Sequence, residues 1–177
     1  MVEWNPVARS PFALRVPSGE KREVRLVDCT PYTKQLVRSR GVDAFAVPHG
    51  RTETTAGGAL VVGTAPGEWF VLAPPEASST TSLDLAADAH VIDLTHGRAL
   101  LRLTGERSDR VLQKLCAVDL HDRVTPNHTA FRSSVAKVVT DVVREDDDGE
   151  RSYLLLSEWS VGQYLADAVL DAGARFR

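Results

Sequence analysis

One stretch of the chain, residues 91–120, constrains the possible fold more than any other part of the sequence. Two segments in it, 91–95 and 99–103, are rich in Val, Ile and Leu, and they flank a Thr-His-Gly-Arg turn. Short aliphatic segments bounded by turn residues are typical of strands. The stretch therefore predicts two strands that meet at His96 and Gly97.

A helix is expected directly after the second of these strands. Gly105 predicts a turn, and residues 106–115 carry aliphatic side chains at helical spacing. The apolar face of this helix would consist of Val111, Leu112 and Leu115.

The order of strands followed by a helix recurs toward the C-terminus. Residues 131–143 include VAKVVTDVV, whose valines predict one strand. The acidic run EDDDGE follows, and its Asp148-Gly149 pair predicts a hairpin tip in water. Residues 153–156 would then form the return strand.

The last predicted helix covers residues 158–172. Ser157 would be its N-cap and Gly173 the residue that ends it. Its apolar side would hold Leu165, Val169 and Leu170.

The beginning of the chain predicts an arm and a strand. Residues 1–20 contain three prolines, which are excluded from a helix interior, so an extended arm is expected. Charged and apolar side chains alternate over residues 23–29, which predicts a half-buried strand.

Residues 30–38 begin with Thr-Pro, a helix-start signal, and predict a helix that Gly41 would end. Residues 59–73 predict a hairpin. The Ser- and Thr-rich piece 74–89 would connect two halves of the chain, with room for a short helix over 82–89.

These elements predict an α+β fold made of two similar halves, each rich in strand, strand and helix. The first half would cover residues 21–89 and the second 90–177, packed together as one compact unit behind the arm 1–20. Neither half has enough strands to cover both faces of its helices. We therefore expect a sandwich in which two sheets share helices.

Composition narrows the classes of partner and location. A formal net charge of -3 with scattered arginines offers no basic face for nucleic acid. No apolar run reaches the length of a membrane span or a signal-peptide core. Cys29 and Cys116 have no metal-ligand spacing around them. A cytoplasmic protein with two buried, reduced thiols is expected.

A metal site is the first chemical hypothesis that the sequence permits. His121 and His128 flank Asp119 and Asp122, which are all possible ligands. The segment has the composition of a polar loop, and Arg123 would repel a cation. We predict no metal site.

A nucleophilic site is also disfavoured. Ser133 and Ser134 could form a triad with His96 and Asp93, yet neither serine lies in a Gly-x-Ser-x-Gly elbow. Cys116 ends an apolar helix face and has no base beside it in the sequence. We predict no catalytic residue on this chain.

Several motifs together carry a resemblance to a known family. They are Arg9-Ser10-Pro11, GEWFVL at 67–72, VIDLTHGR followed by LRLTG at 91–105, and VLQKLCAVDLH at 111–121. In this order and spacing the chain resembles the gamma subunit of heterotetrameric sarcosine oxidase. The closing segment 153–176 resembles the last strand and helix of that subunit.

The resemblance implies an aminomethyltransferase-like fold, since that subunit is similar to part of the aminomethyltransferase of the glycine cleavage system. It implies a complex that oxidises the N-methyl group of sarcosine on a flavin and passes the carbon to tetrahydrofolate. FAD, FMN, NAD and tetrahydrofolate would lie on the alpha, beta and delta partner subunits. This chain would be a non-catalytic subunit that stabilises and shapes the folate region of the alpha subunit.

One residue of the aminomethyltransferase pattern can be followed in this sequence. In that family an Asn-Asp pair follows the helix and its Asp serves the folate-borne reaction, whereas here the matching pair is Val118-Asp119. Asp119 is thus a candidate for folate binding, or a structural residue whose carboxylate accepts backbone amides in the turn. The alternative function is a free-standing folate-binding or aminomethyltransferase-like protein.

Overall fold

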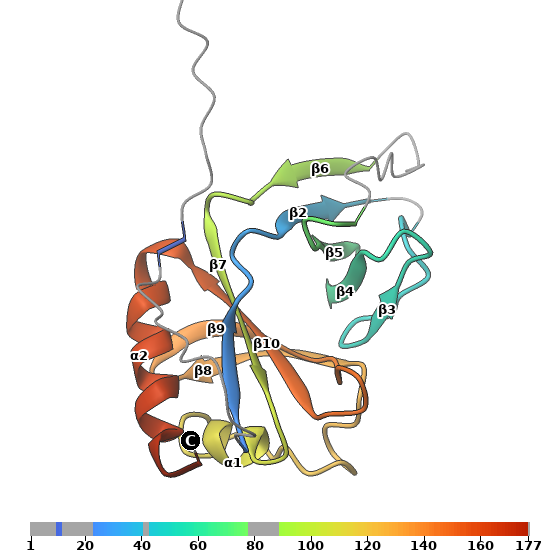
Figure 1. Ribbon diagram of the computed structural model, residues 1–177. Coiled ribbons are helices and arrows are strands. Elements are labelled where there is room, and N and C mark those ends of the chain that lie inside the picture. Colours follow the sequence, from blue (N-terminus) through green and yellow to red (C-terminus); the bar gives the residue numbers. More distant parts are fainter. Residues whose placement is uncertain (1–9, 12–22, 41–42, 78–88, 177) are drawn as a thin grey trace, which may run out of the picture.

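The computed structural model describes residues 10–11, 23–40, 43–77 and 89–176. Within these ranges the chain forms two antiparallel sheets of five strands each, with helices on one side (Figure 1). Most of the predicted arm 1–20, Gly41 and residues 82–88 of the predicted connector helix lie outside the described residues.

The first sheet, which we call the helix-covered sheet, has its strands in the spatial order Arg25–Asp28 (β1), Arg98–Thr104 (β7), Ser152–Glu158 (β10), Val138–Arg144 (β9) and Thr129–Val135 (β8). The second sheet has the order Thr52–Thr54 (β3), Leu60–Ala65 (β4), Glu68–Ala73 (β5), Thr33–Arg38 (β2) and His90–Asp93 (β6).

Two α-helices occur in the described ranges, α1 (Ser108–Leu112) and α2 (Gly162–Ala172). Two 3₁₀ turns flank α2, Trp159–Val161 before it and Ala174–Phe176 after it. No helix in these ranges has the length and apolar character needed to cross a membrane.

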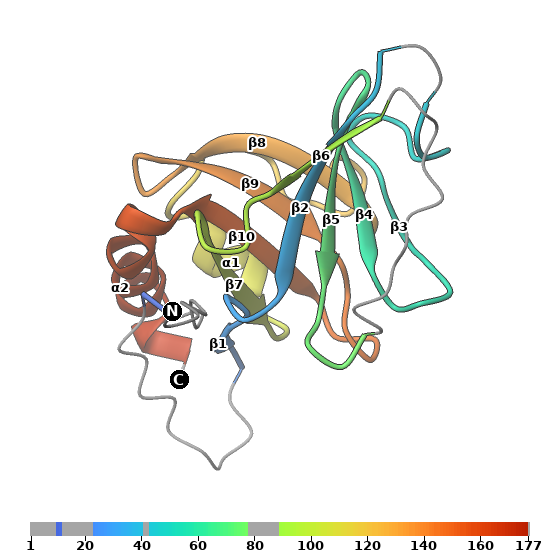
Figure 2. The same cartoon turned by 90° about the horizontal axis from the view of Figure 1, so that it is seen from above.

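The layers are visible in Figure 2, where the helices lie on one side of the helix-covered sheet and the second sheet on its other side. The helices pack on the sheet through a buried cluster that includes Leu101, Leu103, Val111, Leu155, Leu165 and Val169. An inter-sheet core lies between the two sheets and includes Phe70, Leu72, Leu100, Leu154 and Leu156. The outer face of the second sheet carries a third cluster around Trp69, whose indole Nε1 donates to the Val47 carbonyl at 2.8 Å.

The α+β fold class is confirmed by this arrangement. The predicted hairpin over residues 59–73 forms as β4 and β5. The predicted tip at Asp148 and Gly149 also forms, with φ angles of 48° and 79°. The strands expected at 91–95 and 99–103 are present as β6 and β7, but they belong to different sheets.

The helix expected over residues 30–38 is wrong, because residues 33–38 form strand β2. This strand is paired on both sides, with β5 and with β6. Two consecutive residues of β2 pack on opposite faces of the sheet. Leu36 packs against the inter-sheet core, and Val37 belongs to the outer cluster around Trp69. Pairing on two sides thus outweighs the helix-start signal of Thr30-Pro31.

Residues 131–143 form two strands where one was expected. β8 and β9 pair as a hairpin, and their turn residues Ala136 and Lys137 have φ angles of 50° and 67°. Two central residues with positive φ define a type I′ turn, for which Asn-Gly is the usual sequence. The Ala136-Lys137 pair is not a sequence that predicts this type of turn, so the hairpin was not expected.

Both helices differ from their predicted bounds. α1 covers Ser108–Leu112 and not 106–115. α2 begins at Gly162, after a 3₁₀ turn, so Ser157 is a residue of β10 and not an N-cap. Gly173 ends α2, as predicted. The expectation that both sheets share the helices is also wrong, since α1 and α2 pack on the helix-covered sheet.

The chain crosses between the two sheets at residues 29–32 and again at 94–97. The fully buried side chain of Lys34 lies at the first crossing. Its Nζ donates to the carbonyl oxygens of Thr30 at 2.6 Å and Tyr32 at 2.8 Å. One buried cation therefore satisfies two carbonyls of the turn that connects the sheets.

The backbone of Lys34 holds the second crossing as well. Its carbonyl accepts the Leu94 amide at 2.8 Å, and its amide donates to Thr95 Oγ1 at 3.1 Å. Burial lowers the pKa of the Lys34 ammonium to about 8.

The division of the chain into halves at residue 89 stays a prediction. The strands β1 and β6 each lie in the sheet that is formed mainly by the other half.

The pH dependence of stability tests the role of Lys34. Below pH 8 the side chain is protonated in both the folded and the unfolded chain, whereas between about 8 and 10.5 the folded chain binds fewer protons. The Lys34 contribution to the free energy of unfolding therefore rises with pH across this window, by at most about 1.4 kcal/mol per pH unit. Urea unfolding at several pH values should show this rise for the natural chain relative to Lys34→Met, and parallel curves would contradict it.

Candidate functional site

Asp119 lies in the loop of residues 116–128 between α1 and β8, which we call the Asp119 loop. The side chain is exposed, and its Oδ1 accepts the backbone amide of His121 at 2.9 Å. The Asp119 carbonyl accepts the hydroxyl of Thr125 at 2.7 Å. The neighbouring Val118 packs partly against the core beneath the helices. The carboxylate of Asp119 thus closes a turn within its own loop.

A buried arginine ties this loop to the adjacent hairpin of β9 and β10. Arg144 has a side chain only 6% exposed, and its Nη1 donates to Asp122 Oδ1 and to the Thr125 carbonyl, both at 2.6 Å. Its Nε and Nη2 each contact a different oxygen of Asp146 at 3.2 Å. Arg144 therefore holds the loop and the hairpin tip in one geometry.

A second arginine extends the network toward α1. Arg151 contacts Asp122 at 2.5 Å and Asp109 at 3.2 Å. The hydrogen bond from Arg144 lowers the pKa of the Asp122 carboxyl, followed by the charge of Arg151. Asp122 is therefore held as an anion, which suits a structural ion pair and not proton transfer at neutral pH.

A buried tyrosine lies next to these arginines. The hydroxyl of Tyr153 is the one buried side-chain polar atom of the described ranges that lacks a hydrogen-bond partner. Burial raises the pKa of Tyr153 to about 12, so the phenol stays protonated at neutral pH.

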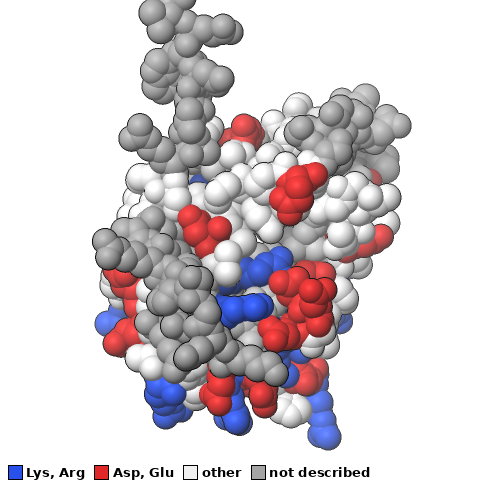
Figure 3. All heavy atoms as spheres, in the orientation of Figure 1, with Lys and Arg blue, Asp and Glu red and all other residues white. Residues whose placement is uncertain are grey.

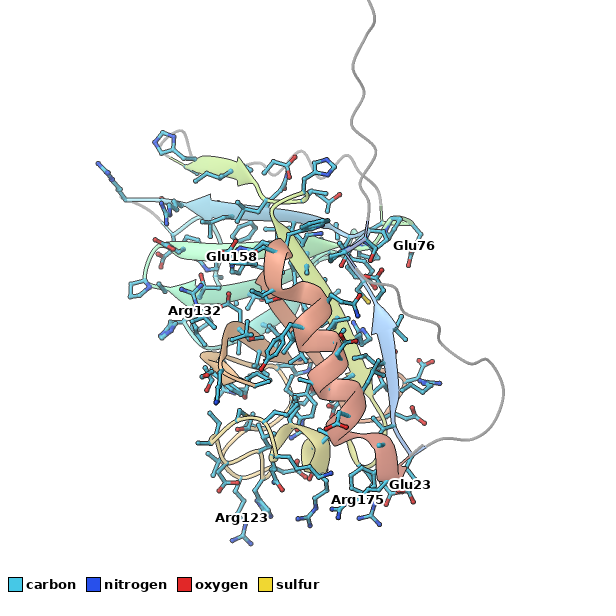
Figure 4. All side chains as sticks on the ribbon, turned by 90° about the vertical axis from the view of Figure 1, so that its left-hand side faces the viewer. Glu23, Glu76, Arg123, Arg132, Glu158 and Arg175 are labelled. Atoms are coloured by element: carbon cyan, nitrogen blue, oxygen red, sulfur yellow. The ribbon has the colours of Figure 1, made fainter. Side chains whose placement is uncertain are left out.

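The residues considered for a metal site each have other partners. His121 Nδ1 accepts the Arg123 amide at 3.2 Å, and His128 Nδ1 lies 3.0 Å from Glu145 Oε2. Within the described residues no group of three or more His, Cys, Asp or Glu side chains has metal-binding geometry. Arg123 points away from the molecule at its lower end (Figure 4).

The residues considered for a triad lie on opposite sides of the sandwich. Ser133 and Ser134 belong to β8, an edge strand of the helix-covered sheet. Asp93 ends β6, an edge strand of the second sheet, and its Oδ1 accepts the Thr95 amide at 2.8 Å. The topology does not bring these groups together.

The two thiols are free and buried. Cys116 packs in the cluster beneath the helices, and Cys29 packs in the inter-sheet core. Burial raises the pKa of both thiols. Each therefore behaves as a small apolar side chain and not as a thiolate nucleophile at neutral pH.

Two pockets, which sequence reasoning did not find, border the inter-sheet core. One of about 330 Å³ is lined by the ion pair of Arg132 and Asp141, whose Nε and Oδ1 are 2.7 Å apart, together with His49. The other, of about 210 Å³, is lined by Arg102 and Glu145 among others. These arginines come from different strands, so no local spacing in the sequence marks either pocket.

Comparison of the sequence with known proteins gives three related chains of the same kind. A sarcosine oxidase subunit gamma from Corynebacterium sp. strain P-1 is 29% identical over 122 residues, which cover 67% of this chain and 59% of the relative. The subunit gamma from an Arthrobacter species is 28% identical over 130 residues, covering 72% of this chain and 63% of the relative. The chain is therefore similar in sequence to gamma subunits of sarcosine oxidase.

The match to these gamma subunits is partial in length. The chain spans about three fifths of the first two relatives, 59% and 63%. A third gamma subunit, from Corynebacterium sp. strain U-96, is 31% identical over 86 residues, or 49% of this chain and 40% of the relative. No protein-family model matches the chain.

Solved structures show the same fold. A chain of heterotetrameric sarcosine oxidase from Corynebacterium sp. U-96, solved with pyrrole 2-carboxylate, has a TM-score of 0.75 at 24% identity and covers 89% of this chain and 87% of that one. The glycine cleavage system aminomethyltransferase T from Bartonella henselae has a TM-score of 0.61 at 16% identity, covering 84% of this chain and 46% of that one. The predicted aminomethyltransferase-like fold is confirmed.

Removal of the buried arginine tests whether the Asp119 loop depends on it. Arg144→Gln leaves Asp146 and the Thr125 carbonyl without their cation, so we expect a loss of about 3 kcal/mol in the free energy of unfolding. The control Arg38→Gln breaks the exposed ion pair with Glu68 and should cost less than about 1 kcal/mol. Denaturant unfolding of both variants measures the difference, and equal losses would contradict the assignment.

Proposed function

We propose that this chain is the gamma-type subunit of a heterotetrameric sarcosine oxidase complex in the cytoplasm. Its partners would be the alpha, beta and delta subunits, which would carry FAD, FMN, NAD and tetrahydrofolate. The complex would oxidise the N-methyl group of sarcosine and transfer the carbon to tetrahydrofolate. The observation that carries the proposal is that three sequence relatives are gamma subunits and a sarcosine oxidase chain shares the fold.

The role proposed for this chain is to stabilise and shape the folate region of the alpha subunit. The titratable groups of the Asp119 loop support such a role, because Asp119 closes a turn and Asp122 is paired with two arginines. The folate candidate position lacks the Asn of the aminomethyltransferase pattern, and Val118 in its place packs against the core.

Two sheet edges offer contact area to partner subunits. The edge strand β8 meets the residue just before the edge strand β3 through a bridge between Thr129 and Arg51. The other two edge strands, β1 and β6, carry apolar side chains that are 40–45% exposed, namely Val27, Val91 and Ile92. Exposed apolar edges of this kind favour association with another chain.

Expression with and without partners tests the subunit role. The chain expressed alone should self-associate, because the apolar edges of β1 and β6 remain uncovered. Co-expressed with the alpha, beta and delta subunits it should sediment as one complex, with an interface of roughly 2,000 Å² or more. A stable monomer that does not co-purify with these subunits would contradict the proposal.

Titration with tetrahydrofolate distinguishes this proposal from a free-standing folate-binding or aminomethyltransferase-like protein. We expect no micromolar binding by the chain alone. Asp119→Ala should lower the free energy of unfolding by about 1 kcal/mol, because the His121 amide loses its acceptor, and should leave folate turnover by the complex unchanged. Micromolar binding by the chain alone, weakened in Asp119→Ala, would favour the folate-binding protein instead.

A further inference from the structure

A pocket lies between strand β4 of the second sheet and the hairpin of β8 and β9. It has a volume of about 330 Å³ and is lined by residues of these three strands and by His49. Three buried side chains of the inter-sheet core, Val62, Ala130 and Val143, belong to this lining. An apolar cavity of about 150 Å³ is enough to bind benzene, so the pocket has room for a ring with a small substituent.

One ion pair supplies the charged groups of this lining. Arg132 Nε donates to Asp141 Oδ1 at 2.7 Å, and Arg132 Nη2 donates to Asp141 Oδ2 at 3.1 Å. The Asp141 side chain is 9% exposed, whereas that of Arg132 is 57% exposed. Arg132 lies at the side of the molecule, next to the strands of the second sheet (Figure 4). The carboxylate is therefore inside the pocket, and the guanidinium reaches from the pocket to water.

Both members of the pair keep hydrogen-bonding capacity. An ionised carboxylate has about four acceptor positions, and a guanidinium has five N–H donors. Among the described residues, Asp141 accepts side-chain hydrogen bonds from Arg132 alone, and no acceptor bonds to Arg132 Nη1. A buried carboxylate is stabilised by each further donor that it receives. A ligand that offers one N–H and one carbonyl oxygen therefore matches the pair.

The pair also determines which net charge a ligand can carry. Its two charges offset each other, and Glu68, the other carboxylate that acts on Arg132, is paired with Arg38 at 3.1 Å. A further anion in the pocket would be repelled by Asp141 and a further cation by Arg132. Acidic and basic side chains also lie next to each other on the face of the molecule seen in Figure 3. An uncharged ligand is therefore favoured over either ion.

We propose that this pocket binds a small uncharged amide with an apolar body. The amide N–H donates to the Asp141 carboxylate, and the amide carbonyl accepts a free N–H of Arg132. The apolar body lies against Val62, Ala130 and Val143. The site is independent of the subunit role proposed above, because all of its residues belong to this chain.

Benzamide is a suitable probe, with benzoate and benzylammonium as the anion and the cation of similar shape. In NMR titrations of the full chain, alone or in the complex with which it purifies, benzamide should shift the methyl signals of Val62, Ala130 and Val143 saturably. It should bind about tenfold or more tightly than either ion, since each ion brings a like charge close to one member of the pair in a partly buried pocket. The absence of a saturable shift, or equal binding of the three molecules, would overturn the proposal.

Two variants locate the binding. Ala130→Leu fills the pocket and should weaken benzamide binding by about tenfold or more, while the matched control Ala117→Leu adds the same atoms at an exposed position and should leave it unchanged. The double variant Arg132→Met, Asp141→Leu replaces the pair by apolar side chains, which proteins tolerate better than the loss of one partner, and should also weaken the binding. If Ala130→Leu does not fold, the double variant decides the matter. Unchanged benzamide binding in the folded variants of the pocket would refute the site.

Discussion

The buried ammonium of Lys34 at the crossing between the two sheets is the contact on which the sandwich depends. Its ammonium donates to two backbone carbonyls of the turn that joins β1 to β2, and its own backbone holds the segment that joins β6 to β7. Each sheet contains one edge strand from the other part of the chain. The two sheets therefore cannot separate without breaking the hydrogen bonds that Lys34 makes at both crossings.

Arginine plays the corresponding role on the other side of the helix-covered sheet. Arg144 is almost completely buried and joins the Asp119 loop to the tip of the β9–β10 hairpin through Asp122 and Asp146. The polar residues that stand out in the sequence of this loop are thus part of a structural network. The hydrogen bond from Arg144 that holds the loop also lowers the pKa of Asp122, so this carboxylate does not transfer protons at neutral pH.

The fold is shared with an aminomethyltransferase of which this chain matches 46%, while the likeness of sequence is to sarcosine oxidase gamma subunits. A shared fold does not carry a shared reaction, because reactions depend on particular side chains. The position that would carry the folate carboxylate here follows a valine and closes a local turn. Among the described residues, the exposed apolar side chains of β1 and β6 and the pockets that border the inter-sheet core are features available for interaction.

The sequence by itself determined the elements whose signals are local. The hairpin over residues 59–73, the Asp148-Gly149 tip, the strands on either side of His96-Gly97 and the end of α2 at Gly173 all follow from β-branched runs and turn residues. The motifs that resemble sarcosine oxidase gamma subunits were also visible, because they depend on order and spacing.

Only the tertiary structure decided how these elements pair. β2 is a strand because β5 and β6 pair with it on both sides, although its Thr-Pro start favours a helix. β6 and β7 lie in different sheets, and β8 and β9 turn at an Ala-Lys pair that carries no turn signal. The partners of Lys34, Arg102 and Arg144 include residues distant in the sequence or groups of the backbone. The pairing of distant strands and the burial of charged side chains are determined by contacts between distant parts of the chain. The local spacing of residues in the sequence does not encode these contacts.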